Sequence, residues 1–139
     1  MNGEYGSWIF YAPVLHAGSD TITVELPGTP SGLMLNAYAL EYSGVGALDG
    51  VYGQNGTTSA MHSGVVTTTA PGDLIFGFGI TTFLGMGSTM ASGGFTSHPA
   101  VHNNLTEDEI FPGTGPVEAT GMMVTGSAWT MMVAAFKAR

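Results

Sequence analysis

Cysteine is absent from this chain of 139 residues, and Lys137 and Arg139 are its only basic residues apart from histidines. The absence of cysteine excludes disulfides, thiolate metal ligands and a cysteine nucleophile. Ten acidic residues give a formal net charge of −8, and a chain so poor in Lys and Arg cannot displace the counterions of a phosphate backbone. We therefore expect neither nucleic acid nor an anionic membrane surface as a partner.

Long apolar runs are missing as well. No stretch approaches the roughly 20 apolar residues that span a membrane, and residues 1–6 lack the basic start and apolar core of a signal peptide. A hydrophobic fraction of 44% with only 9% charged residues nevertheless favours a folded chain over a disordered one. Solubility must come from acidic residues and from Ser, Thr, Asn and Gly, as in many extracellular bacterial modules. We expect an extracellular or cell-surface location and no membrane insertion.

Alternation with a period of two residues is the pattern that the chain does contain. In residues 20–26 it places Ile22, Val24 and Leu26 on one face of an expected strand. Further strands are expected at residues 7–12, 33–42, 65–69, 74–80, 106–111, 117–124 and 128–136, with a loop at 43–50. Helices are not expected, because no long stretch keeps a helical apolar stripe free of Gly and Pro. We predict an all-β fold, a single antiparallel two-sheet β-sandwich of jelly-roll type over residues 1–139.

Four segments carry a family resemblance. They are LEYSG (40–44), LD (48–49), TTTAPGDLIFG (67–77) and AWTMMVAAFK (128–137). In this order they resemble a family of uncharacterised bacterial extracellular β-sandwich modules, which occur in large secreted or surface proteins beside adhesive and carbohydrate-active domains. The motifs are strand and turn signatures without a catalytic set. The resemblance implies a sandwich fold and an extracellular location more than it implies an activity.

The start of the chain bears on its partners. In modules of this family the strand corresponding to residues 7–12 is usually preceded by several more strands, whereas this chain starts almost on it. The resemblance therefore implies either a fragment or a sandwich completed by strands from another subunit. Unpaired N–H and C=O groups at a sheet edge recruit a partner strand. We expect a homo-oligomer formed through an exposed sheet edge.

Residues Glu107, Asp108 and Glu109 form the one local cluster of hard oxygen ligands. Asp49 is expected to lie near them in space. Calcium takes about six to eight oxygen ligands, and sandwich modules often hold it where loops converge. These four carboxylates are the candidate metal ligands, with calcium as the candidate cofactor. Since neighbouring strand residues point to opposite faces, a solvated acidic edge that discourages aggregation is the alternative.

Histidines suggest a second function class. The four histidines are His16, His62, His98 and His102, and none of their spacings is diagnostic of a metal site. A structural or surface role is the simpler interpretation. The alternative is a small calcium- or zinc-dependent hydrolase with His98, His102 and Glu107 as catalytic residues. It requires the segment 94–111 to fold these groups into one cleft beside a water molecule.

Two aromatic residues are candidate ligand-binding residues. Trp8 follows Ser7 and Tyr52 precedes Gly53, in segments where an aromatic ring is expected to be exposed. Aromatic faces suit the C–H-rich faces of sugars. Together with the missing catalytic set, they favour a non-catalytic module that binds carbohydrate or another protein chain. Such a module would serve in adhesion or as a structural part of a surface assembly or phage particle.

Overall fold

Antiparallel β-strands make up the regular structure of the computed structural model, which describes residues 6–25, 35–82, 89–91 and 93–139. The large sheet contains, in spatial order, β1 (Val45–Gly56), β10 (Trp129–Ala138), β4 (Asp73–Thr81), β7 (Leu105–Phe111) and β6 (Thr96–His98). One small sheet contains β2 (Ala60–His62), β9 (Thr120–Met123) and β5 (Thr89–Ala91), and the other contains β3 (Val66–Thr68) and β8 (Gly115–Val117). These described residues include no helix, so the predicted all-β antiparallel fold is confirmed.

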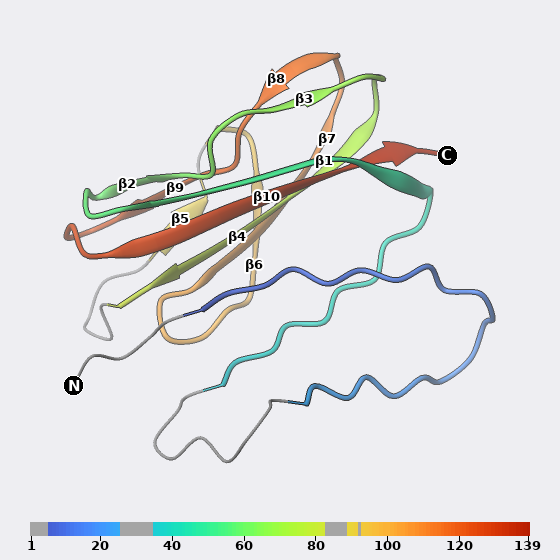
Figure 1. Cartoon of the computed structure of the whole chain (residues 1–139), viewed down its shortest axis with the longest axis horizontal. Helices are drawn as coiled ribbons and strands as arrows, with labels where there is room; N and C mark the ends of the chain where they lie inside the picture. Colours follow the sequence, from blue (N-terminus) through green and yellow to red (C-terminus); the bar gives the residue numbers. More distant parts are fainter. Residues whose placement is uncertain (1–5, 26–34, 83–88, 92) are drawn as a thin grey trace.

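The main core lies between the large sheet and the two small sheets (Figure 1). β4 contributes Ile75 and β10 contributes Met131 and Val133, all of them 1% exposed or less. The small sheets face them with Met61, Val66 and Met123. Two layers that each bury one face are the arrangement of a sandwich, which is the architecture that the alternating strands predict.

The other face of the large sheet is covered by the N-terminal arm, defined here as residues 6–44, of which 6–25 and 35–44 are described. The buried residues of this face are Leu74, Ala134 and Phe136, and Ile9 and Tyr42 of the arm pack against them. Three aromatic pairs join the arm to the sheet: Tyr11 with Phe136, Tyr38 with Phe78 and Tyr42 with Phe76, at centroid distances of 5.2, 5.8 and 6.5 Å. The described parts of the arm contact this face without adding a strand to either edge.

Strand predictions in the arm are wrong for the residues that can be compared. Residues 7–12, 20–25 and 35–42 belong to no strand (Figure 1), and Leu26, Leu33 and Met34 lie outside the described residues. The loop predicted at 43–50 is wrong as well, because most of it is the first half of β1. Alternation indicates an extended chain with two different faces, but a strand exists only where a neighbour accepts its backbone hydrogen bonds.

The remaining strand predictions hold. Residues 74–80 lie within β4 and residues 106–111 within β7, and the strand expected at 128–136 is β10 except for Ala128, which precedes it. The expected strand at 65–69 is the shorter β3, and the one at 117–124 divides between the end of β8 and β9. The described residues also contain no helix long and apolar enough to cross a bilayer.

Gly77 allows the layers to approach closely. A Cβ atom at this position would lie 2.7 Å from the Cβ of Ala119 and 2.8 Å from the Cγ of Glu107. We predict that Gly77→Ala lowers the free energy of unfolding by about 1–3 kcal/mol, because overpacking a close-packed core costs that much. Denaturant unfolding measures the change. Gly113→Ala is the control, since its Cβ would meet only ordinary contacts at 3.7 Å, and equal effects of the two substitutions would contradict the prediction.

Candidate functional site

His98 and Asp108 meet on the arm-covered face of the large sheet, although they come from different strands. Thr96 of β6 pairs with Asp108 of β7, so His98, two residues after Thr96, points to the same face as Asp108. His98 Nε2 lies 2.5 Å from Asp108 Oδ2. The hydroxyl of Tyr42 donates a hydrogen bond of 2.6 Å to the same carboxylate oxygen. We call these three residues the His98 cluster.

The His98 cluster brings three polar side chains together in a partly buried position. The side chains of His98 and Asp108 are 31% and 17% exposed. Burial, the hydrogen bond to Asp108 and the charge of Asp108 raise the pKa of Tyr42 far above its ordinary value. Tyr42 therefore remains a hydrogen-bond donor throughout the physiological pH range. Because Tyr42 belongs to the arm, this bond fastens the end of the arm to β7.

A pocket of about 350 Å³ lies beside the His98 cluster. Its wall is formed by the arm and by the β6–β7 hairpin, through Ala37, Tyr38, Ala39, Leu40, His98, Pro99 and Thr106. The Tyr38 hydroxyl donates to the carbonyl of Val101 at 3.2 Å and accepts from the Val101 N–H and from Asn104 Nδ2, both at 3.1 Å. This hydroxyl is therefore engaged by the turn between β6 and β7 and does not offer the pocket a free polar group.

His102 occupies a different position from His98. It lies in the turn between β6 and β7, exposed, with φ of 57°, and Asn103 follows with φ of 59°. Asparagine tolerates this left-handed conformation better than most residues. The asparagines at 103 and 104 were thus a sequence signal for the hairpin that brings His98 to Asp108, a pairing that the sequence analysis did not identify. Tyr42 was missed because nothing in the sequence shows what covers a sheet face.

Glu107 points into the core, on the opposite face of β7 from Asp108. It pairs in register with Gly77, and its side chain is fully buried. Within the described part of the chain, neither of its carboxyl oxygens has a well-formed hydrogen bond. Burial raises the pKa of Glu107 to about 8, and the backbone N–H of Thr120 opposes this only in part. The carboxyl group is therefore predominantly neutral at pH 7.

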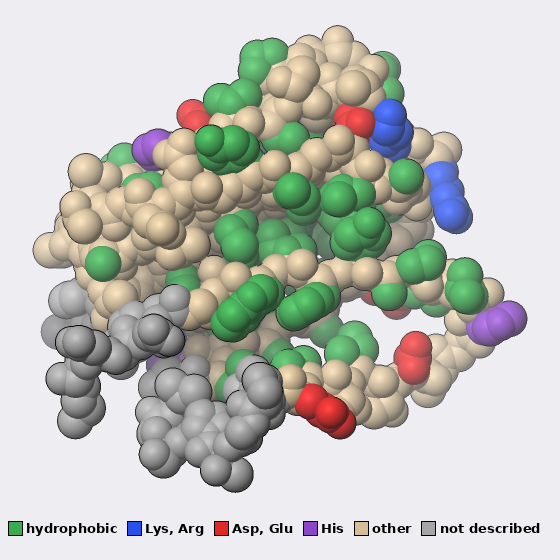
Figure 2. Space-filling model, viewed as in Figure 1, with side chains coloured by type: hydrophobic (Ala, Val, Ile, Leu, Met, Phe, Trp, Pro, Cys, Tyr) green, Lys and Arg blue, Asp and Glu red, His purple; other side chains and the backbone are tan. Residues whose placement is uncertain are grey.

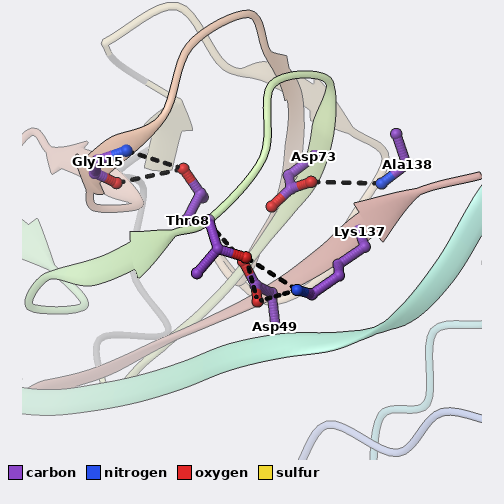
Figure 3. Close-up of polar contacts among 7 residues, drawn as sticks. Asp49, Thr68, Asp73, Gly115, Lys137 and Ala138 are labelled. Carbon is purple, nitrogen blue, oxygen red and sulfur yellow. Dashed lines mark hydrogen bonds and ion pairs between the residues drawn. The ribbon is translucent and has the colours of Figure 1, made fainter.

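Asp49 belongs to a separate ion-pair network at the rim of the sheet (Figure 3). The Lys137 ammonium lies 3.2 Å from Asp49 Oδ1, and the Thr69 N–H donates to Oδ2 at 2.8 Å. Lys137 also donates to the Thr69 hydroxyl oxygen at 2.8 Å. The Thr69 N–H foremost, with Lys137 and the Thr69 hydroxyl, holds the pKa of Asp49 below its usual value. The network ties β1 to β10 and to the end of β3.

The four candidate metal ligands therefore have different surroundings. Asp49 pairs with Lys137, Glu107 lies in the core, and Asp108 belongs to the His98 cluster. Glu109 is half-buried near Gly94, where a Cβ atom would lie 3.5 Å from its Oε1. Among the residues that the structure describes, no three His, Asp or Glu side chains gather as a metal site. Calcium stays a prediction that these four carboxylates do not support by their geometry.

The candidate ligand-binding residues are both exposed. Trp8 is 66% exposed on the arm, and Tyr52 is 51% exposed on β1. Exposure agrees with the reason for choosing them, and their role stays a prediction.

Comparisons of the chain with protein-family models, with curated proteins and with solved structures gave no match. The resemblance to bacterial β-sandwich modules therefore stays a prediction.

The buried carboxyl of Glu107 predicts a pH-dependent stability. Its pKa is about 8 in the folded chain against an ordinary value of 4.5, so the unfolded chain releases this proton first as pH rises. The resulting loss of stability begins near the ordinary pKa and is complete only above pH 8, at several kcal/mol. We predict that Glu107→Gln makes stability depend less on pH and that this variant is more stable than the unsubstituted chain at pH 9. Denaturant unfolding at pH 5, 7 and 9 measures it, with Glu109→Gln as control. Parallel curves for Glu107→Gln and the unsubstituted chain would contradict it.

The hydroxyl of Tyr42 predicts a role in holding the arm. Tyr42→Phe removes the bond to Asp108 and leaves a carboxylate oxygen with one partner fewer, so we expect a loss of about 1–2 kcal/mol in stability. We also expect faster cleavage of the arm by chymotrypsin, which is preferable to trypsin because Lys and Arg occur only at the C-terminus. Tyr11→Phe is the matched control, since its ring is 60% exposed. Equal cleavage rates in the two variants would exclude the role.

Proposed function

We propose that this chain is a non-catalytic, extracellular or cell-surface β-sandwich module whose function is assembly with other copies through its N-terminal arm. The exposure of large apolar side chains along the arm is the observation that supports this. Between 37% and 85% of the surface is exposed for Trp8, Phe10, Tyr11, Val14, Leu15, Ile22, Val24, Leu35 and Leu40. Single exposed apolar residues are ordinary, whereas a contiguous run of them is typical of an interaction surface.

Energetics favour a protein partner for the arm. Fixing the backbone of an extended residue costs about 1–2 kcal/mol, and residues 13–25 are exposed throughout and belong to no strand. Burying one Val, Leu, Ile or Phe side chain contributes about 1.5–3 kcal/mol. Contact with a partner would bury these side chains and offset the cost of ordering the arm. A second copy of the chain is the simplest such partner, because it is present wherever the first copy is present.

Carbohydrate is the alternative to a protein chain as the ligand. A stacking platform needs aromatic rings held on one rigid surface, whereas Trp8 lies on the arm and Tyr52 on an edge strand. The metal-dependent hydrolase is supported still less, because His98 and Glu107 lie on opposite faces of the large sheet. The assembly function is therefore the one that the arrangement of residues favours.

Assembly predicts a mass above the 14.3 kDa of one chain. Leu15 and Ile22 are 79% and 75% exposed, so replacing both with Asp should leave the sandwich folded while making the arm surface polar. We expect light scattering to show an oligomer for the unsubstituted chain and a monomer for the double variant. Val124→Asp, at a residue 70% exposed outside the arm, should leave the mass unchanged.

Calcium and a chelator should not alter the oligomer mass if the arm alone mediates assembly, so both additions belong in the same experiment. A mass that follows calcium would instead support the predicted metal site. A monomeric unsubstituted chain at all concentrations would refute the assembly function and direct attention to a glycan screen.

A further inference from the structure

β1 has an unusually open edge. It is 12 residues long, and within the described part of the chain its only strand partner is β10. Its pairing with β10 is irregular before Gly50 and regular from Gly50 to Gly56. Edge strands are normally protected by Lys, Pro, bulges or shortness, and residues 50–56 contain neither Lys nor Pro and no register shift. We call Gly50–Gly56 the β1 edge.

The arm contains a segment that matches such an edge. Residues Asp20–Glu25 are extended, belong to no strand and alternate between apolar and polar side chains. Ile22 is 75% exposed and Val24 is 48% exposed. This segment has the length and pattern of a strand but lacks the neighbour that would make it one.

We propose that residues 20–25 of one copy pair antiparallel with the β1 edge of a second copy and so add a strand to its large sheet. This inference rests on the proposed assembly function and specifies its interface. β-Strand addition of this kind obtains affinity from main-chain hydrogen bonds and specificity from alternate side chains. Val51 and Tyr52 point to opposite faces of the edge and are 60% and 51% exposed, so each face offers one large apolar side chain to the incoming strand.

Charge favours this edge as the position for an acidic donor strand. The two cations of the chain lie at the end of β10, beside the start of β1 (Figure 2). Lys137 pairs with Asp49, while Arg139 is exposed and has no ion pair among the described residues, and its side chain lies against Gly46. Antiparallel pairing directs Glu25 toward this end of the edge. In a chain of net charge −8, an acidic strand meets less repulsion here than elsewhere on the surface.

Each copy carries one donor segment and one acceptor edge. Two copies can therefore exchange arms reciprocally, and more copies can close a ring, without any second kind of contact. The arm is fastened to its own sheet by Tyr11, Tyr38 and Tyr42, whereas the exposed residues 13–25 are available to a neighbouring copy.

A charged residue on the acceptor edge tests the inference. We expect Val51→Lys in the full chain to raise the dissociation constant of the oligomer at least tenfold in light scattering over a concentration series. Val124→Lys makes the same change at a residue of similar exposure, 70%, and should leave the constant unchanged. Melting curves verify that both variants are folded.

Cross-linking tests the donor. The chain has no cysteine, so Thr23→Cys in one preparation and Gln54→Cys in another provide unique sites when the two are mixed. A short bis-maleimide should join them into a heterodimer, while Thr125→Cys in place of Gln54→Cys should give none.

The outcomes separate the inference from the function on which it rests. A monomeric unsubstituted chain refutes both. An oligomer that resists Val51→Lys and gives no cross-link overturns the inference and leaves assembly through the arm intact. An oligomer that Val51→Lys dissociates, but that gives no cross-link, means that β1 pairs with its own counterpart and overturns the arm as donor. Dissociation together with the cross-link supports the inference.

Discussion

The ladder between β4 and β10 is the interaction on which the rest of this structure depends. It runs without a register shift from Thr81 and Trp129 to Leu74 and Phe136, and both strands carry large apolar side chains on both faces. A sheet of this kind needs cover on each side, since exposed apolar area costs about 25 cal/mol per Å². The small sheets cover one face and the N-terminal arm covers the other. The arm thus supplies the cover that the second apolar face of β4 and β10 requires. Its apolar residues that stay exposed are the basis of the proposed assembly.

Close approach of the layers has an electrostatic consequence. Gly77 brings Ala119 near the large sheet, and the space that remains encloses Glu107 beside it without a well-formed hydrogen bond among the described residues. A buried carboxyl group with so little hydrogen bonding is stable mainly in its neutral form. One face of β7 therefore holds a neutral acid, while the next residue, Asp108, accepts the hydrogen bond by which Tyr42 secures the arm. Two neighbouring residues of β7 therefore act on different properties: Glu107 affects the pH dependence of stability, and Asp108 helps to hold the arm.

The arm differs along its length in how strongly it is attached. Its two ends contact the sheet through aromatic pairs and the His98 cluster, whereas residues 13–25 are exposed throughout. Segments with few buried contacts are the ones that exchange between copies at low cost. The proposed assembly needs both features. The attached ends of the arm cover the sheet within one copy, and the exposed residues 13–25 are free to contact another copy. The acidic surface opposes unspecific association, because like charges repel except near Lys137 and Arg139.

The sequence by itself determined the all-β class and the strands β3, β4, β7 and β10, because period-two alternation is a local property of neighbouring residues. The nearness of His98 to the acidic residues 107–109 entered only as a requirement of the alternative hydrolase. Only the tertiary structure decided that β1 is a strand, that residues 7–12 and 20–25 are not, and that Glu107 and Asp108 face opposite ways into different environments. Pairing partners, sheet register and the cover over each face depend on residues distant in the chain. Local alternation cannot encode them, and that is the physical reason for the division.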